Sequence, residues 1–136
     1  MIRLLIADDH TGVRLALEDL FGSTPDISVV AACSDGDEVL PAARSTRPHV
    51  ALLDHAMPRM TGLQAAAQLR DECPEVRVVM LTGTVGSGVM AEARELGAAG
   101  FLAKGEDSDA LPHHIRTVAD GGSAWPEPVP VGGRPG

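Results

Sequence analysis

Five polar side chains in this sequence directly follow short apolar runs. Asp8 and Asp9 follow RLLIA, Asp54 follows VALL, Thr82 follows VVML and Lys104 follows GFLA. Two adjacent carboxylates repel each other and are costly to bury without compensation. The pair therefore either lies in water or binds something positive.

Together these side chains could bind a cation and an anion. Carboxylates from neighbouring strands suit Mg²⁺, which takes one or two carboxylates, keeps several waters and often accepts phosphate oxygens. Near such an ion, Asp54 could act as a nucleophile and form an acyl phosphate. Thr82 could donate a hydrogen bond to a phosphoryl oxygen. Lys104, the single lysine among eleven basic residues, could supply positive charge to that group.

Each of these residues also has an ordinary structural interpretation. Asp8 and Asp9 could cap a helix, Asp54 could form a turn, and Thr82 could end a strand. Lys104 could be a solvated surface residue. The placement of all five after apolar runs favours the shared site.

The elements that would position these residues alternate along the chain. Apolar runs rich in Val, Ile and Leu predict strands, and stretches with apolar residues at helical spacing predict helices. The predicted strands are 2–7, 28–33, 50–53, 76–81 and 100–103. The predicted helices are 13–21, 36–44, 63–72, 89–96 and 111–118. Pro41 is tolerated in its helix only in the first turn or at a kink.

This alternation predicts an α/β fold: a doubly wound, five-stranded parallel sheet with helices on both faces, in three layers. The carboxyl ends of parallel strands lie at one edge of the sheet, and open α/β sheets bind ligands there. The five polar side chains should therefore meet in one crevice.

Composition limits the function classes. A chain of 136 residues fits one domain, and its formal charge of −8 argues against direct binding of nucleic acid. The sequence predicts neither a membrane span nor a signal peptide, so we expect a cytoplasmic protein. Cys33 and Cys73 are isolated from each other and are expected to be reduced thiols.

The end of the chain has a different composition. The last sixteen residues, GGSAWPEPVPVGGRPG, contain four prolines and five glycines, which predicts a flexible or extended tail over 122–136. The domain is expected over 1–121. Trp125, the only tryptophan, either folds back on the domain or contacts a partner.

The motifs LLIADDH, LLDHAMPRMTG, MLTG and GAAGFLAK occur in the order and spacing of a known family. Over about residues 2–121 the chain resembles the receiver domain of bacterial two-component response regulators, of the NarL/FixJ (LuxR-type) class. The resemblance implies a flavodoxin-like fold with strand order 2-1-3-4-5.

Site roles follow from the same resemblance. Asp54 would be the phosphoacceptor, and Asp9 and Asp54 would ligate Mg²⁺ directly. Asp8 would act mainly through water, and the backbone carbonyl of Ala56 would complete the ligands that the protein supplies. Ala56 has no side chain that could orient an attacking water.

The resemblance also implies a switch. Thr82 and Lys104 would bind the phosphoryl group, and Phe101 matches the aromatic switch position of the fifth strand. In the family, phosphorylation draws the Thr hydroxyl toward the phosphate and the aromatic ring turns inward. The alternative is that Phe101 is simply a core residue.

The implied partner is a sensor histidine kinase. A homodimer or a downstream protein would then read the altered surface around the fourth helix, fifth strand and fifth helix. The chain would be a signalling phosphoacceptor and not an enzyme, apart from its own phosphorylation and dephosphorylation. Two departures from the family pattern are Gly105, where many receivers have Pro, and His55 after the phosphoacceptor.

Three alternatives compete. The stretch GTVGSG resembles a nucleotide-binding glycine loop, but it follows the fourth strand and no acidic residue ends the next one. The chain could be an interaction module that works without phosphorylation. It could also be the receiver part of a LuxR-type DNA-binding transcription regulator.

His113 and His114 are not expected to share a metal site, because neighbours in a helix point about 100° apart. They are expected at the surface.

Overall fold

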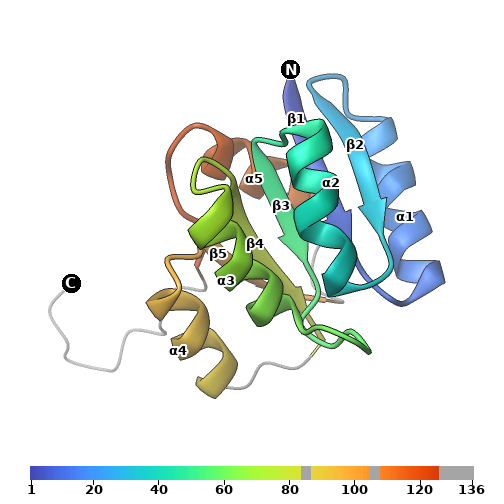
Figure 1. Cartoon of the computed structure of the whole chain (residues 1–136). Helices are drawn as coiled ribbons and strands as arrows, with labels where there is room; N and C mark the ends of the chain where they lie inside the picture. Colours follow the sequence, from blue (N-terminus) through green and yellow to red (C-terminus); the bar gives the residue numbers. More distant parts are fainter. Residues whose placement is uncertain (84–86, 105–107, 126–136) are drawn as a thin grey trace, which may run out of the picture.

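The computed structural model describes residues 1–83, 87–104 and 108–125 (Figure 1). Five parallel strands form one sheet in the order β2-β1-β3-β4-β5, which confirms the predicted topology. The strands are β1 (Ile2–Ala7), β2 (Ile27–Cys33), β3 (Val50–Leu53), β4 (Arg77–Thr82) and β5 (Gly100–Ala103). Three of the five, β1, β3 and β5, have the predicted bounds.

Helices cover both faces of the sheet, giving three layers (Figure 1). Helices α2, α3 and α4 lie on one face and α1 and α5 on the other. The α-helices are α1 (Thr11–Gly22), α2 (Val39–Thr46), α3 (Gly62–Glu72), α4 (Ser87–Glu95) and α5 (Leu111–Ala119). Two short 3-10 turns, η1 (Gly36–Glu38) and η2 (Ser108–Ala110), precede α2 and α5.

The alternation of side chains along β1 divides the core in two. Leu4 and Ile6 point to the α1/α5 face, where they belong to the same apolar cluster as Phe21 and Ile115. Leu5 points to the opposite face and joins the cluster under α2, α3 and α4. Because both faces of β1 are buried, the strand reads as an unbroken apolar run in the sequence.

The helix predicted over 36–44 differs in its start. A 3-10 turn occupies Gly36–Glu38, and α2 begins only at Val39. Pro41 therefore lies in the first turn of α2, where its missing N–H costs no helical hydrogen bond. Cys33 and Cys73 are both buried, and burial raises the pKa of the Cys33 thiol to about 11.

The packed domain extends beyond the boundary predicted at residue 121. Ala124 forms a parallel β-bridge with Gly100: the Ala124 N–H donates to Ala99, and the Phe101 N–H donates to Ala124. The Trp125 ring stacks on Phe101 at 6.3 Å between centroids and 9° between planes. Trp125 thus folds back on the domain, while residues 126–136 lie outside the described part of the chain.

Trp125 should stabilise the edge of the sheet at β5. The guanidinium of Arg94, at the end of α4, lies 4.4 Å from the centre of the Trp125 ring. Replacing Trp125 by Ala removes both the ring stack and the cation–π contact, so we expect a loss of about 1–2 kcal/mol in the free energy of unfolding. Urea denaturation followed by circular dichroism measures it. Trp125→Phe should recover most of the loss, and equal losses in the two variants would contradict the stacking argument.

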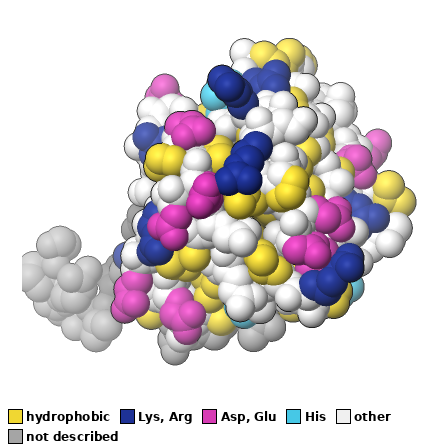
Figure 2. Space-filling view, in the orientation of Figure 1, with side chains coloured by type: hydrophobic (Ala, Val, Ile, Leu, Met, Phe, Trp, Pro, Cys, Tyr) yellow, Lys and Arg dark blue, Asp and Glu magenta, His cyan; other side chains and the backbone are white. Residues whose placement is uncertain are grey.

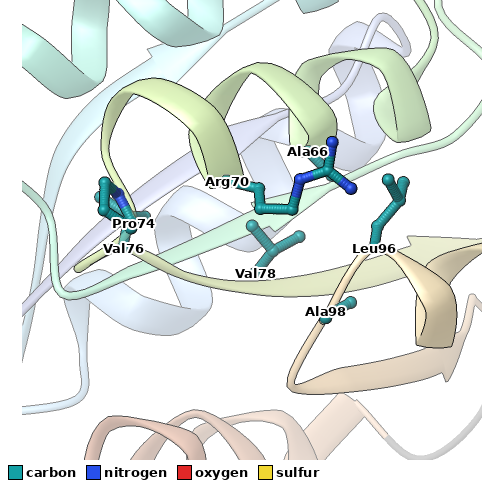
Figure 3. A pocket seen from close by; sticks show the side chains of 8 residues that line it. Ala66, Arg70, Pro74, Val76, Val78, Leu96 and Ala98 are labelled. Carbon is teal, nitrogen blue, oxygen red and sulfur yellow. The ribbon is translucent and has the colours of Figure 1, made fainter.

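One pocket of the structure lies apart from the carboxyl edge. Figure 3 shows a pocket between α3, the start of β4 and the end of α4, lined by apolar side chains and Arg70. It lies toward the amino end of β4, away from Asp54.

On the face seen in Figure 2, Lys and Arg side chains are interspersed with Asp and Glu. Within the described residues, no helix is both long and apolar enough to span a membrane.

Candidate functional site

Three of the predicted side chains meet at the carboxyl edge of the sheet. Asp8 follows β1, Asp54 follows β3 and Lys104 follows β5. The Lys104 ammonium lies 2.7 Å from Asp8 Oδ2 and 3.1 Å from Asp54 Oδ2. Both carboxylates are buried, with 1% and 2% of their surface exposed. One ammonium thus faces two buried carboxylates.

Asp9 and His10 lie on the solvent side of this group. His10 Nδ1 is 3.2 Å from Asp8 Oδ1, 3.2 Å from Asp9 Oδ1 and 3.8 Å from Asp54 Oδ2. Potential ligand atoms of these four residues all lie within 4.8 Å of one another. The cluster could hold a metal ion, because three carboxylates exceed what one ammonium can neutralise.

The electrostatics of the cluster follow from this excess of negative charge. Burial, and the nearby charge of Asp8, raise the pKa of the Asp54 carboxyl, although Lys104 and the Ala56 N–H act in the opposite direction. Burial alone would lower the pKa of Lys104, but hydrogen bonds and charges from Asp8 and Asp54 outweigh it and raise that pKa. Lys104 is therefore protonated at neutral pH, whereas ionisation of Asp54 is less favourable than that of an exposed aspartate.

The other predicted site residues lie beside the cluster. Thr82 is buried at the end of β4, and its backbone carbonyl accepts a hydrogen bond from the Lys104 N–H at 2.8 Å. Ala56 is exposed two residues after Asp54. Phe101 is fully buried in the cluster under α2, α3 and α4, so its ring points inward in this structure.

The backbone around Asp8 and Asp54 is held by local contacts. The Asp8 carbonyl accepts a hydrogen bond from the Arg14 guanidinium at 2.8 Å, and Asp8 Oδ1 accepts one from the His10 N–H at 2.8 Å. Gly62, at the start of α3, packs so closely on the Asp54 carbonyl that no Cβ would fit there. Side-chain position at this edge is thus fixed by several independent contacts.

Two of these residues were not identified from the sequence. The signal for His10 is its position directly after Asp8 and Asp9 in the motif LLIADDH. Arg14 had no sequence signal, because its contact is to a backbone carbonyl.

His113 and His114 contact each other on α5, at 5.8 Å between ring centroids, and neither belongs to the carboxylate cluster. Gly105 and residues 84–86 of the GTVGSG stretch lie outside the described residues.

Comparison with known proteins agrees with this geometry. Residues 4–116 match the family model described as the response regulator receiver domain. The chain belongs to this family of receiver domains. The family fold was expected from the motifs, and the carboxylate cluster lies on the matched segment.

Relatives of this receiver domain are regulators. It is 33% identical over 126 residues to the transcriptional regulatory protein LnrK of Bacillus subtilis, covering 93% of this chain and 57% of the relative. It is 34% identical over 121 residues to the response regulator GacA of Pseudomonas protegens, covering 89% and 57%. The chain therefore spans little more than half the length of these relatives. Together with the family model, the names of these relatives indicate a signalling protein.

Solved structures place the receiver domain in the LuxR/NarL class. The signal receiver domain of a NarL response regulator from Mycobacterium tuberculosis matches with a TM-score of 0.84 and 30% identity, covering 88% of this chain and 97% of that one. A LuxR-family two-component response regulator from Aurantimonas matches with a TM-score of 0.86 and 29% identity, covering 91% and 89%.

Proposed function

We propose that this receiver domain accepts a phosphoryl group on Asp54 from a sensor histidine kinase. The observation that carries the proposal is the arrangement of two buried carboxylates around one ammonium at the carboxyl edge, with Lys104 at 2.7 Å from Asp8 and 3.1 Å from Asp54. An oxygen of Asp54 would bond to phosphorus while the bond from phosphorus to the donor breaks. The donor group leaves with the electron pair of that bond.

The residues at this edge fit a hard divalent cation. Asp9 and Asp54 would bind Mg²⁺ directly, Asp8 would act mainly through water, and the Ala56 carbonyl would complete the set. When bound, Mg²⁺ supplies positive charge that neutralises the transferred phosphoryl group. Lys104 would then exchange its contact with Asp54 for a phosphoryl oxygen, and the Thr82 hydroxyl would donate to another.

The same site would control a switch. A phosphoryl group adds a charge of roughly −1.5 to −2 at neutral pH. Movement of Thr82 toward it would change the space beside Phe101, whose ring is buried in the cluster under α2, α3 and α4 and stacks on Trp125. The surface of α4, β5 and α5 would change as a result, and a second copy or a downstream protein would recognise it. The only chemistry expected of the chain itself is its own phosphorylation and dephosphorylation.

Incubating the wild-type chain with acetyl phosphate, with and without Mg²⁺, tests the proposal. Intact mass should show one added phosphoryl group, strongly dependent on Mg²⁺, and peptide mapping after borohydride trapping should locate it at Asp54. Absence of labelling, or labelling at another residue, would overturn the assignment. Tight binding of NAD(P) in a parallel titration would instead favour the dinucleotide alternative.

A wider role follows from the relatives. LnrK is named as a transcriptional regulatory protein, and this chain covers 57% of its length. We propose that the receiver regulates transcription through a partner or a further domain, and that it does not itself contact DNA. The formal charge of −8 supports the second point.

A further inference from the structure

Asp35 joins two loops on the α2/α3 side of the carboxyl edge. The residue is 3% exposed and lies just before η1. Its carboxylate accepts hydrogen bonds from the backbone N–H groups of Gly36 at 2.7 Å, Met60 at 3.1 Å and Arg59 at 3.2 Å. The Arg59 Nε donates to it as well, at 3.2 Å. One side chain thus ties the segment after β2 to the segment after β3.

The segment after β3 is the loop from Asp54 to Gly62, which we call the acceptor loop. At its base, the His55 carbonyl accepts hydrogen bonds from the Met57 N–H at 3.1 Å and the Gly62 N–H at 3.0 Å. At its far side, only the contacts of Arg59 and Met60 with Asp35 are hydrogen bonds to another part of the described chain. The side chain of Met57 is also buried in the core under α2, α3 and α4. Hydrogen bonds therefore hold the loop at two points, and Asp35 supplies the second.

Close packing reinforces the second point. Gly36 lies so near the Met60 carbonyl that a Cβ on residue 36 would collide with it. A collision with backbone cannot be relieved by a change of rotamer, so any larger residue here would push the acceptor loop away. The sequence thus provides both a hydrogen-bond acceptor and the space for the loop to approach it.

We propose that Asp35 is a positioning residue that fixes the acceptor loop, and with it the Ala56 carbonyl, for binding of the divalent cation. The inference rests on the proposed function, because it assumes that Ala56 contributes to the cation site. Asp35 lies outside the carboxylate cluster and would not touch the cation or the phosphoryl group. It would act only through its hydrogen bonds with Arg59 and Met60.

A carboxylate suits this position better than an amide. The donors that meet Asp35 are three backbone N–H groups and one guanidinium N–H, and an Asn amide would turn its own NH₂ toward some of them. Burial alone would raise the pKa of Asp35, but the donors from Met60, Arg59 and Gly36 outweigh it and lower the pKa. Asp35 therefore stays ionised at neutral pH.

Calorimetric titration of Mg²⁺ into Asp35→Asn tests the inference without any phosphoryl donor. Outer contacts that orient the ligands of a metal typically contribute about 10–100-fold in affinity, so we expect the dissociation constant to rise about tenfold or more. Labelling by acetyl phosphate should slow at low Mg²⁺ and approach the wild-type rate at saturating Mg²⁺. This split distinguishes weaker cation binding from damage to the acceptor.

Two matched controls separate positioning from general stability. Asp37→Asn changes the other carboxylate near Arg59, which lies 3.4 Å from its Nε, and should leave Mg²⁺ affinity unchanged. Asp26→Asn removes a carboxylate–arginine pair with Arg116, at 2.7 and 3.0 Å, at the amino end of β2. It should also leave Mg²⁺ affinity unchanged. Circular dichroism establishes that each variant is folded.

Gly36→Ala provides an independent variant. It leaves the Asp35 carboxylate intact but displaces the acceptor loop, so its Mg²⁺ affinity should fall as in Asp35→Asn. Wild-type affinity in both folded variants would overturn the inference, as would an equal loss in Asp26→Asn or no Mg²⁺ binding by the wild type. Weaker Mg²⁺ binding in the variants, combined with no phosphorylation of the wild type, would instead reject the proposed function and retain the positioning role.

Discussion

Asp54→Asn is expected to abolish phosphorylation by acetyl phosphate in the presence of Mg²⁺. Asn keeps the shape of the side chain but lacks the nucleophilic oxygen that would form the acyl phosphate. It also removes one negative charge from the cation site, so Mg²⁺ should bind more weakly. Intact mass spectrometry measures the first effect and calorimetric titration the second.

The same variant should be more stable than the wild type when no metal is present. The folded state raises the pKa of Asp54. Ionisation of this carboxyl therefore opposes folding once the pH exceeds the pKa of an aspartate in the unfolded chain, about 3.9. A neutral Asn removes that cost at pH 7. Each kcal/mol regained should raise Tm by about 3 °C in a chain of this size.

Adding Mg²⁺ should reverse the order of stability. A ligand that binds only the folded wild type stabilises it by about 2.7 kcal/mol at one hundred times its dissociation constant, and Asp54→Asn should gain less. Asp71→Asn is the control, since Asp71 is an exposed carboxylate on α3 paired with Arg70. Phosphorylation of Asp54→Asn to the wild-type extent would show that another residue is the acceptor.

Lys104→Met is expected to slow phosphorylation by about 10²–10³-fold, the usual effect of removing one group that stabilises a developing charge. Met fills a similar volume without the ammonium. The measurement is the initial rate of labelling by acetyl phosphate at saturating Mg²⁺. A rate within a few-fold of the wild type would mean that Lys104 only balances charge in the resting state.

Lys104→Met should also destabilise the metal-free protein. Removing one partner of a buried ion pair costs about 3–5 kcal/mol, because the remaining charge is left uncompensated. The folded state raises the pKa of Lys104. The stability that this ammonium contributes is therefore fully present below its pKa in the unfolded chain, and it is lost only as the pH rises through its pKa in the folded state. The loss should therefore be evident at pH 7 by urea denaturation.

Two conditions should reduce this destabilisation. Lowering the pH until Asp54 is protonated removes one of the two charges that Lys104 balances, and Mg²⁺ supplies positive charge in its place. Lys104→Arg is the matched variant, since it keeps the charge but changes its geometry. It should recover stability more fully than the rate of phosphorylation. Equal recovery of both would show that charge alone is required.

Most of the fold could be predicted from the local pattern of the chain. Strands β1, β3 and β5 begin and end at the predicted residues, and each ends where its apolar run meets a charged residue: Asp8, Asp54 or Lys104. The predicted start of the second helix at residue 36 was wrong, because Gly36–Glu38 folds as a 3-10 turn and α2 begins at Val39. Hydrophobic periodicity does not distinguish these two kinds of turn over three residues.

Composition left the position of the last packed segment undecided. Proline and glycine around Trp125 indicated a tail, whereas Ala124 pairs with Gly100 and the Trp125 ring stacks on Phe101. Both contacts join residues far apart in the chain. Composition reports only the local preference of a segment and contains no information on such a partner.

The sequence by itself determined which residues reach the carboxyl edge of the sheet. In a parallel sheet this follows from chain direction, so Asp8, Asp54 and Lys104 could be identified from their places after apolar runs. Only the tertiary structure decided how close they lie, that His10 joins them, and that Asp35 holds the acceptor loop. Those contacts depend on strand register and loop packing, and the sequence does not encode either of these locally.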